Sequence, residues 1–163
     1  DLNIDGNLLA EGSSRVFKDL MRVADAGDIT LSSLQGDVVI GSSARVSVNA
    51  DGFGGNAGSL TVNAGKGTLL VDGTIEGRAS LNHVSGGFHL DAGNLADNGS
   101  SSFTGLNDML DAGGFVHSRQ FRVRNGSVTI DSNITSRHFG LAVPSLMPPP
   151  RPSTARARAA RSC

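Results

Sequence analysis

Aliphatic and small polar residues alternate in short segments along most of the chain. One five-residue pattern, glycine followed by a small residue, an aliphatic, any residue and a second aliphatic, occurs at residues 27–31, 36–40, 58–62, 67–71 and 126–130. Looser copies lie at residues 44–48, 87–90 and 120–123. Because successive side chains of a β-strand point to opposite faces, each copy predicts a short strand with one apolar and one polar face.

The spacing between copies indicates how these strands are connected. Neighbouring copies begin nine residues apart at residues 27 and 36, and again at residues 58 and 67. This is the spacing of one short strand and one tight turn. Residues 38–40 and 69–71 are apolar throughout, so we expect a neighbouring segment to cover their outer faces.

Two segments depart from the strand pattern. Residues 15–21, "RVFKDLM", fit either a helical turn or a covering strand, and the sequence leaves both open. Apolar residues recur at nearly helical spacing over residues 103–110, as Phe103, Leu106, Met109 and Leu110. This spacing predicts a short helical excursion, after which we expect the strands to resume at Gly114.

Asp-Gly and Asn-Gly pairs, which tolerate a positive φ, separate the predicted strands at residues 5–6, 51–52, 72–73, 98–99 and 125–126. Such pairs also suit two-residue hairpins, so an antiparallel sandwich is the alternative fold. A sandwich of this length normally has longer strands and more aromatic side chains. We therefore predict an all-β chain that folds as a right-handed parallel β-helix, with Gly, Asn and Asp at its corners and aliphatic side chains stacked inside.

The composition fits one domain with a thin core. The chain has 163 residues, of which 22 are glycine and 4% aromatic, with no tryptophan and no tyrosine. Val, Leu and Ile must then supply the core. The formal net charge of −1 would not attract nucleic acid, so we expect no nucleic-acid partner. Cys163 is the only cysteine, which excludes an intrachain disulfide and a cysteine-based zinc site.

We divide the chain into a β-helix repeat segment, residues 1–142, and a tail, residues 143–163. The tail holds all five prolines of the chain together with four arginines, and no strand pattern continues into it. We expect this Pro/Arg/Ala-rich tail to be disordered, with binding to nucleic acid or an acidic surface as the alternative. A shift of reading frame would explain the abrupt change. Because the chain begins at Asp1 without a signal segment, we expect a fragment or a processed piece.

A β-helix that cleaves polysaccharides would need carboxylates, or a carboxylate with arginine or lysine, on one outer face. The candidates in this sequence are Asp108, Asp111, Arg119, Arg122 and Arg124. Arg122 and Arg124 share one strand face and could meet an acidic sugar or a phosphate. We favour the interpretation that these residues form a solvated strand flank, and we predict no catalytic residues.

No pattern in the chain is typical of a metal or cofactor site. The histidines have no metal-ligand spacing and no cysteine partners: His83, His89, His117 and His138. Of these, we expect His89 to point outward. Residues 54–60, "GGNAGSL", are similar to the calcium-binding nonapeptide repeat, but Ala57 and Ser59 replace its third glycine and its aspartate. We therefore predict no metal, no cofactor and no small-molecule substrate.

Three segments carry a resemblance to a known group of proteins. They are "AGSLTVNAGKGTLLVDGTIEG" at residues 57–77, "GGFHLDAGNL" at residues 86–95 and "LNDMLDAGGFVHSRQFRVRNGSVTID" at residues 106–131. Together, residues 28–135 resemble the repeat region of large filamentous-haemagglutinin-like exoproteins of Gram-negative bacteria. This resemblance implies a parallel β-helix in the passenger of an exported adhesin, carried across the outer membrane by a partner transporter. It supplies no catalytic residues.

From these observations we expect a non-enzymatic structural segment, a stalk, of a secreted or cell-surface bacterial adhesin. Host or surface glycans or proteins would bind the parent protein as receptors, and an outer-membrane transporter would be its secretion partner. A carbohydrate-active β-helix enzyme and a polysaccharide-binding solenoid are the alternatives.

Overall fold

The computed structural model describes residues 1–96 and 99–147. These residues are mostly β-strand, and the named strand pairs are parallel except for one antiparallel hairpin. The predicted predominance of β structure with parallel sheets is therefore confirmed, and the antiparallel alternative is wrong. Within the described ranges, no helix is long and apolar enough to span a bilayer.

The first seven strands are β1 (Leu2–Ile4), β2 (Asn7–Leu9), β3 (Ser13–Phe17), β4 (Leu20–Ala24), β5 (Ile29–Ser32), β6 (Val38–Ile40) and β7 (Arg45–Ser47). They are followed by β8 (Ser59–Val71), β9 (Thr74–Glu76), β10 (Gly87–Asn94) and the helix α1 (Phe103–Gly113). The last strands are β11 (Ser118–Val123), β12 (Ser127–Thr129), β13 (His138–Ala142) and β14 (Ser145–Met147).

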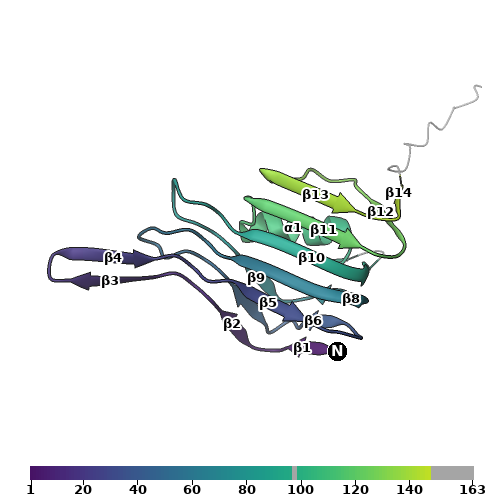
Figure 1. Cartoon of the computed structure of the whole chain (residues 1–163), viewed down its shortest axis with the longest axis horizontal. Helices are drawn as coiled ribbons and strands as arrows, with labels where there is room; N and C mark the ends of the chain where they lie inside the picture. The colour runs from purple at the N-terminus through teal and green to yellow at the C-terminus, as the bar shows by residue number, and fades with distance from the viewer. Residues whose placement is uncertain (97–98, 148–163) are drawn as a thin grey trace, which may run out of the picture.

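The chain passes through a stack of strands several times, and we call each passage a tier. In chain order, the described tiers contain β1 and β2; β5, β6 and β7; β8 and β9; β10 and α1; β11 and β12; and β13 and β14. Figure 1 shows the main sheet rising through β1, β6, β8, β10, β11 and β13, with α1 behind β10 and β11. A second parallel sheet joins β2, β7 and β9.

The strand register gives the length of chain in one tier. Ile29 pairs with Leu60, Leu60 with Phe88, and Phe88 with Arg119. These pairs are 31, 28 and 31 residues apart in the sequence. The long strand β8 spans two strands of the tier before it, because its first part pairs with β5 and its last part with β6.

The aliphatic positions of the sequence pattern form columns inside the stack. Leu31, Val62, Leu90 and Phe121 are successive partners across four strands and are all buried. A single core cluster contains Leu60, Leu69 and Val128, which belong to three different copies of the pattern. The expected core of Val, Leu and Ile describes the lower tiers, but the upper tiers are filled by phenylalanines: Phe88, Phe103, Phe115 and Phe121.

Residues 38–40 and residues 69–71, which are apolar throughout, each place one side chain on the outer face of the sheet. Val39 and Leu70 are paired neighbours on β6 and β8, and both are half-buried. Across the pair, each side chain lies next to the other. Part of the neighbouring segment that we expected to cover each outer face is therefore the paired strand of the adjacent tier.

The glycines that open the pattern lie where the backbones of adjacent tiers approach most closely. A Cβ atom added at Gly58 would lie 1.8 Å from the carbonyl oxygen of Gly27, one tier below. One added at Gly67 would lie 2.2 Å from the carbonyl oxygen of Gly36. At these two positions a side chain would overlap the backbone carbonyl of the tier below, which explains the glycine at the start of both copies of the pattern in β8.

The predicted helical excursion is confirmed as α1. The Ser102 hydroxyl caps its start by accepting a hydrogen bond from the backbone N–H of Gly105. At its end, Gly114 adopts a left-handed conformation with φ of 82°. This C-cap turns the chain before the next strand, so strands resume at Ser118 and not at Gly114 as expected.

Residues 15–21, for which the sequence left two possibilities, form neither a helical turn nor a covering strand. They lie in the antiparallel hairpin of β3 and β4, whose strands are joined at Lys18 and Asp19. Figure 1 shows this hairpin projecting away from the main stack. The two strands of the hairpin pair with each other, whereas a covering strand would pack against the core.

The boundary predicted at residue 142 moves toward the C-terminus. Ser145, Leu146 and Met147 form β14, which pairs in parallel with β12. Pro144 precedes this strand, at a position where its missing N–H interrupts no ladder. The remainder of the predicted tail, residues 148–163, lies outside the described residues.

The stacked glycines lead to a stability prediction. We expect Gly58→Ala to lower the free energy of unfolding by about 2 kcal/mol or more, because the new methyl group would overlap the Gly27 carbonyl and force adjacent tiers apart. Gly52→Ala is the matched control, because a Cβ atom there meets no atom within 4 Å. Urea denaturation followed by circular dichroism measures both variants. Equal stabilities of the two would contradict the close-approach explanation.

Candidate functional site

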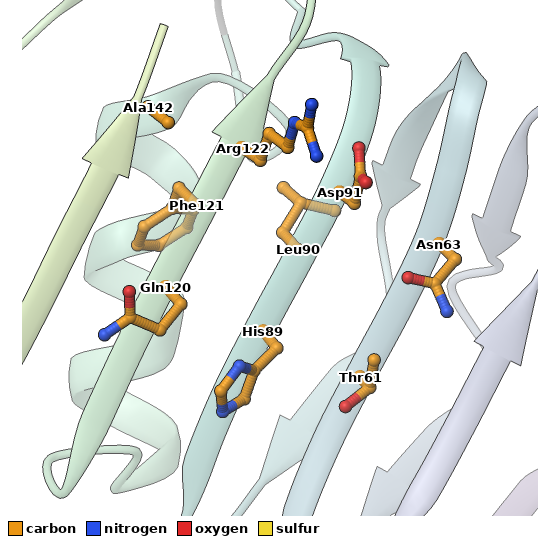
Figure 2. A pocket seen from close by; sticks show the side chains of 9 residues that line it. All are labelled: Thr61, Asn63, His89, Leu90, Asp91, Gln120, Phe121, Arg122 and Ala142. Atoms are coloured by element: carbon orange, nitrogen blue, oxygen red, sulfur yellow. The ribbon is translucent and has the colours of Figure 1, made fainter.

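An open groove lies on the outer face of the main sheet, over β8, β10 and β11 (Figure 2). Its volume is about 390 Å³. The residues that line it are Thr61, Asn63, His89, Leu90, Asp91, Gln120, Phe121, Arg122 and Ala142. Most of them are polar side chains at the outward positions of three adjacent strands, so the strand alternation seen in the sequence creates this surface.

The register arranges the polar side chains in two rows that cross the strands. Thr61, His89 and Gln120 are successive partners and form the first row. Asn63, Asp91 and Arg122 form the second row, two residues further along each strand. Figure 2 shows both rows on the same side of the sheet, and His89 is exposed, as expected.

Asp91, the middle residue of the second row, forms a charge pair with Arg124. Arg124 donates from Nε and Nη2 to the two carboxylate oxygens of Asp91, at 2.7 and 2.6 Å. These hydrogen bonds hold the pKa of Asp91 below its usual range, against the opposing effect of partial burial. Arg122 adds a favourable charge, but within the described part of the chain its guanidinium makes no hydrogen bond or ion pair.

This geometry is suited to binding by hydrogen bonds and charge. Asp91 is the one carboxylate that lines the groove, whereas glycoside hydrolysis ordinarily uses two. The lowered pKa of Asp91 also lies further from neutral pH, so this carboxyl group is less suited to proton transfer at that pH. Groups that remain available to a ligand include the imidazole of His89, the amide of Gln120 and the guanidinium of Arg122.

The five residues weighed as a catalytic cluster do not lie together in the structure. Arg122 is exposed on the outer face of β11, whereas Arg119 is fully buried on the opposite face of the same strand. Asp111 lies on α1 and forms an ion pair with Arg119. Asp108 is exposed on α1, and Arg124 is bound to Asp91. The strand thus separates the two arginines that the sequence placed three residues apart.

Arg119 is the residue whose environment the sequence analysis missed. Its Nε donates to the carbonyl oxygen of Phe115 at 2.7 Å, and its Nη1 donates to Oδ1 of Asn107 at 2.6 Å. With Asp111 as its third partner, the guanidinium links α1 and the segment after it to β11. The sequence could have shown that Arg119 faces inward, because it lies two and four residues before the inward-facing Phe121 and Val123 on the same strand.

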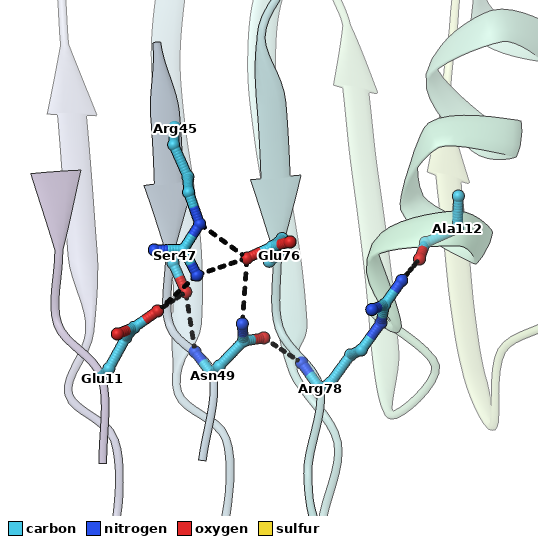
Figure 3. A network of polar contacts seen from close by, with 7 residues as sticks. All are labelled: Glu11, Arg45, Ser47, Asn49, Glu76, Arg78 and Ala112. Atoms are coloured by element: carbon cyan, nitrogen blue, oxygen red, sulfur yellow. Dashed lines mark hydrogen bonds and ion pairs between the residues drawn. The ribbon is translucent and has the colours of Figure 1, made fainter. Parts of the chain in front are cut away.

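A second polar network lies on the sheet of β2, β7 and β9 (Figure 3). Arg45 on β7 donates to Glu11 at 2.7 Å in the tier below and to Glu76 at 2.6 Å in the tier above. The hydrogen bond from Ser47, and then the charge of Arg45, lower the pKa of Glu11, while burial opposes them. Hydrogen bonds to Glu76 and Glu11 raise the pKa of Arg45. The network holds three tiers together.

The same column of polar contacts continues toward α1. Asn49 donates from Nδ2 to Glu76 at 3.0 Å and accepts from the backbone N–H of Arg78 at 2.7 Å. The Arg78 guanidinium in turn donates to the carbonyl oxygen of Ala112 at the end of α1. Because its charged groups are already paired, this face offers fewer free groups to a ligand than the groove.

His117, His138 and Ser59 of the calcium-like segment lie where strands of the main sheet begin. His117 and His138 meet edge to face, with ring centres 5.5 Å apart. Ser59, at the position of the missing calcium ligand, donates through its hydroxyl to Asp28 of the tier below at 2.7 Å. Among the described residues, no group of three or more His, Cys, Asp or Glu could hold a metal ion.

The Asp91–Arg124 pair predicts a specific response to acid. Because the pKa of Asp91 in the folded state lies below its unfolded value of about 3.9, its contribution is complete above that pH and is lost as the pH falls through the folded pKa. We expect Asp91→Asn to be less stable than the parent chain at pH 7, by less than about 1 kcal/mol for this partly exposed pair. The difference should shrink as the pH falls below about 4.

Thermal melts of the two proteins over this pH range measure the effect. Asp108→Asn is the matched control, since Asp108 is an exposed carboxylate on α1 without a bonded partner in the described ranges. A stability difference for Asp91→Asn that stays constant as the pH falls would show that the ionised pair contributes nothing.

Comparisons with known proteins identify no relative of this chain. No protein-family model matches it, and neither the curated proteins nor the solved structures contain a match.

Proposed function

We propose that this chain is a segment of a right-handed parallel β-helix that acts as a non-enzymatic stalk in a secreted or cell-surface bacterial adhesin. The observation that carries the proposal is the repeated register, in which the successive strands β5, β8, β10 and β11 pair in parallel at offsets of 28 to 31 residues. A chain that adds tiers in this way grows along one axis. Length along one axis is the property that a stalk requires.

The contacts between tiers support a mechanical role. Most side-chain hydrogen bonds that link tiers join residues about 31 positions apart, among them those from Asn56 to Asp25, from Ser59 to Asp28 and from Lys66 to Gln35. Each tier is therefore tied to the next by backbone ladders, inner columns and outer polar contacts. A rod built in this way resists shear between neighbouring tiers without a large globular core.

The resemblance of residues 28–135 to filamentous-haemagglutinin-like exoproteins supports the surface location and the partner transporter. The receptors, glycans or proteins of a host or of another surface, would be bound by other parts of the parent protein. The open groove in Figure 2 favours the second candidate, a polysaccharide-binding solenoid, because it leaves His89, Gln120 and Arg122 available on one face.

The tiered architecture predicts that one whole tier can be removed. Deletion of residues 29–59 takes out 31 residues, which equals the offset between Ile29 and Leu60. In the parent chain, β6 lies between β1 and the last part of β8 and pairs with both. After the deletion removes β6, we expect β1 to pair directly with the last part of β8. The deletion is made with Glu11→Gln, because the loss of Arg45 would otherwise leave Glu11 facing Glu76.

Circular dichroism and thermal melting measure the outcome. The variant should keep a β spectrum and a cooperative transition at a moderately lower temperature. Deletion of residues 29–43 is the matched control, because it removes about half a tier and destroys the register. If both deletions unfold the chain, or if neither does, the solenoid is the wrong architecture.

The cellular role is tested in the bacterium that makes the parent protein. Antibodies raised against residues 1–142 should label intact cells, and protease added outside the cells should remove the label. Loss of the outer-membrane transporter should abolish the labelling, because the passenger would then remain inside. Labelling that appears only after the cells are lysed, with the transporter present, would contradict the proposed surface stalk.

A further inference from the structure

The hairpin of β3 and β4 has features that the stalk does not use. Five of its apolar side chains are 39 to 65% exposed: Val16, Phe17, Leu20, Met21 and Val23. None of them belongs to the core cluster, and the hairpin projects from the stack in Figure 1. A two-stranded hairpin without further packing is marginally stable in water. Exposed apolar side chains gathered on such an element mark an interaction surface.

The register divides these side chains between two faces. Phe17 pairs with Leu20 next to the turn, and Val16 pairs with Met21 one position back. Because alternate residues share a face, Val23 lies on the side of Val16 and Met21. Both faces of the hairpin are therefore partly apolar, and each strand has one edge that pairs with no other strand in the described ranges.

The charges on the hairpin are arranged unfavourably for the isolated chain. Arg15 and Arg22 are directly opposite each other on the face that carries Phe17 and Leu20. Like charges at opposed positions of a hairpin are destabilising. No carboxylate of the described residues forms an ion pair with either arginine. The pair therefore lacks the anionic partner that would make it favourable.

Three possible occupants fit this surface less well than an acidic strand. A second copy of the hairpin would bring two further arginines to the same site. The segment of residues 148–163 has four arginines and no acidic residue, so its charge has the wrong sign. An anionic membrane would meet Asp19 at the turn, and the chain has no tryptophan or tyrosine to anchor it at the lipid interface.

We propose that the β3–β4 hairpin binds an extended, acidic segment of a partner protein, which adds as a third strand to one free edge. Main-chain hydrogen bonds would extend the ladder, carboxylates of the segment would pair with Arg15 and Arg22, and its alternate apolar side chains would cover Val16 and Met21. The inference is independent of the stalk, because it rests on the hairpin alone.

The probe is an array of synthetic peptides in three matched sets, with glutamate, glutamine or lysine alternating with varied aliphatic residues. The full 163-residue chain should bind the glutamate set more tightly than the glutamine set, on the order of tenfold at low salt, and should not bind the lysine set. Added salt should reduce the preference for glutamate.

Charge reversal distinguishes a specific site from general attraction. Arg15→Glu with Arg22→Glu should lose the glutamate set and gain the lysine set, while circular dichroism and the melting temperature of the stack stay unchanged. Arg137→Glu, an exposed arginine outside the hairpin, is the matched control and should keep the preference of the parent chain. Met21→Ser should weaken binding of both the glutamate and the glutamine set, because it removes an apolar contact on the face opposite the arginines.

Three results would overturn the proposal. The first is equal binding of the three peptide sets, or loss of binding in Arg137→Glu as well. The second is binding to vesicles of phosphatidylserine and phosphatidylcholine in place of the peptides, which would assign the hairpin to a membrane. The third is self-association in sedimentation experiments that Met21→Ser abolishes, which would assign the surface to a second copy of the chain.

Discussion

The close stacking of one tier of backbone on the next is the constraint on which the rest of the structure depends. Parallel ladders join the inner strands of the main sheet to the strands above and below, so their side chains have neighbours of fixed identity at the same position of the next tier. At the corners the separation is too small for a Cβ atom, as the Gly58–Gly27 and Gly67–Gly36 contacts show. Gly58, Gly67 and the paired polar and aliphatic positions of the sequence pattern are consequences of this one geometry.

The upper tiers adapt to the same constraint with different chemistry. In the fourth tier α1 takes the place of the strand that would continue the sheet of β2, β7 and β9, and phenylalanines pack beside it in the core. Arg119 occupies the inner column of Leu60 and Phe88, where an aliphatic residue stands in the lower tiers. Its burial is made tolerable by Phe115, Asn107 and Asp111, which together satisfy the guanidinium. A buried charge thus holds the helix on the stack.

On the outer surface, some charged side chains are paired within the chain, whereas others remain available to a ligand. Arg45 and Arg124 are used between tiers, whereas Arg122 in the groove and Arg15 and Arg22 on the hairpin have no bonded carboxylate among the described residues. The groove and the hairpin also differ in kind, because one is a polar strip across three strands and the other is an apolar projection with opposed cations. In the proposed stalk, such side elements would combine spacing with recognition.

The sequence by itself determined the elements whose signal is local. Alternation at Leu60 and Val62 predicted inward-facing strand residues, and the spacing of Phe103, Leu106 and Leu110 predicted the helix, because both periodicities are properties of a single segment. Only the tertiary structure decided the partners: which strands stack, that Arg119 faces Asp111, that residues 15–21 pair with each other, and that Asp91 and Arg122 line one groove. These contacts join residues from different tiers or from different elements, and their identity depends on the length of chain in each loop, which no short pattern contains.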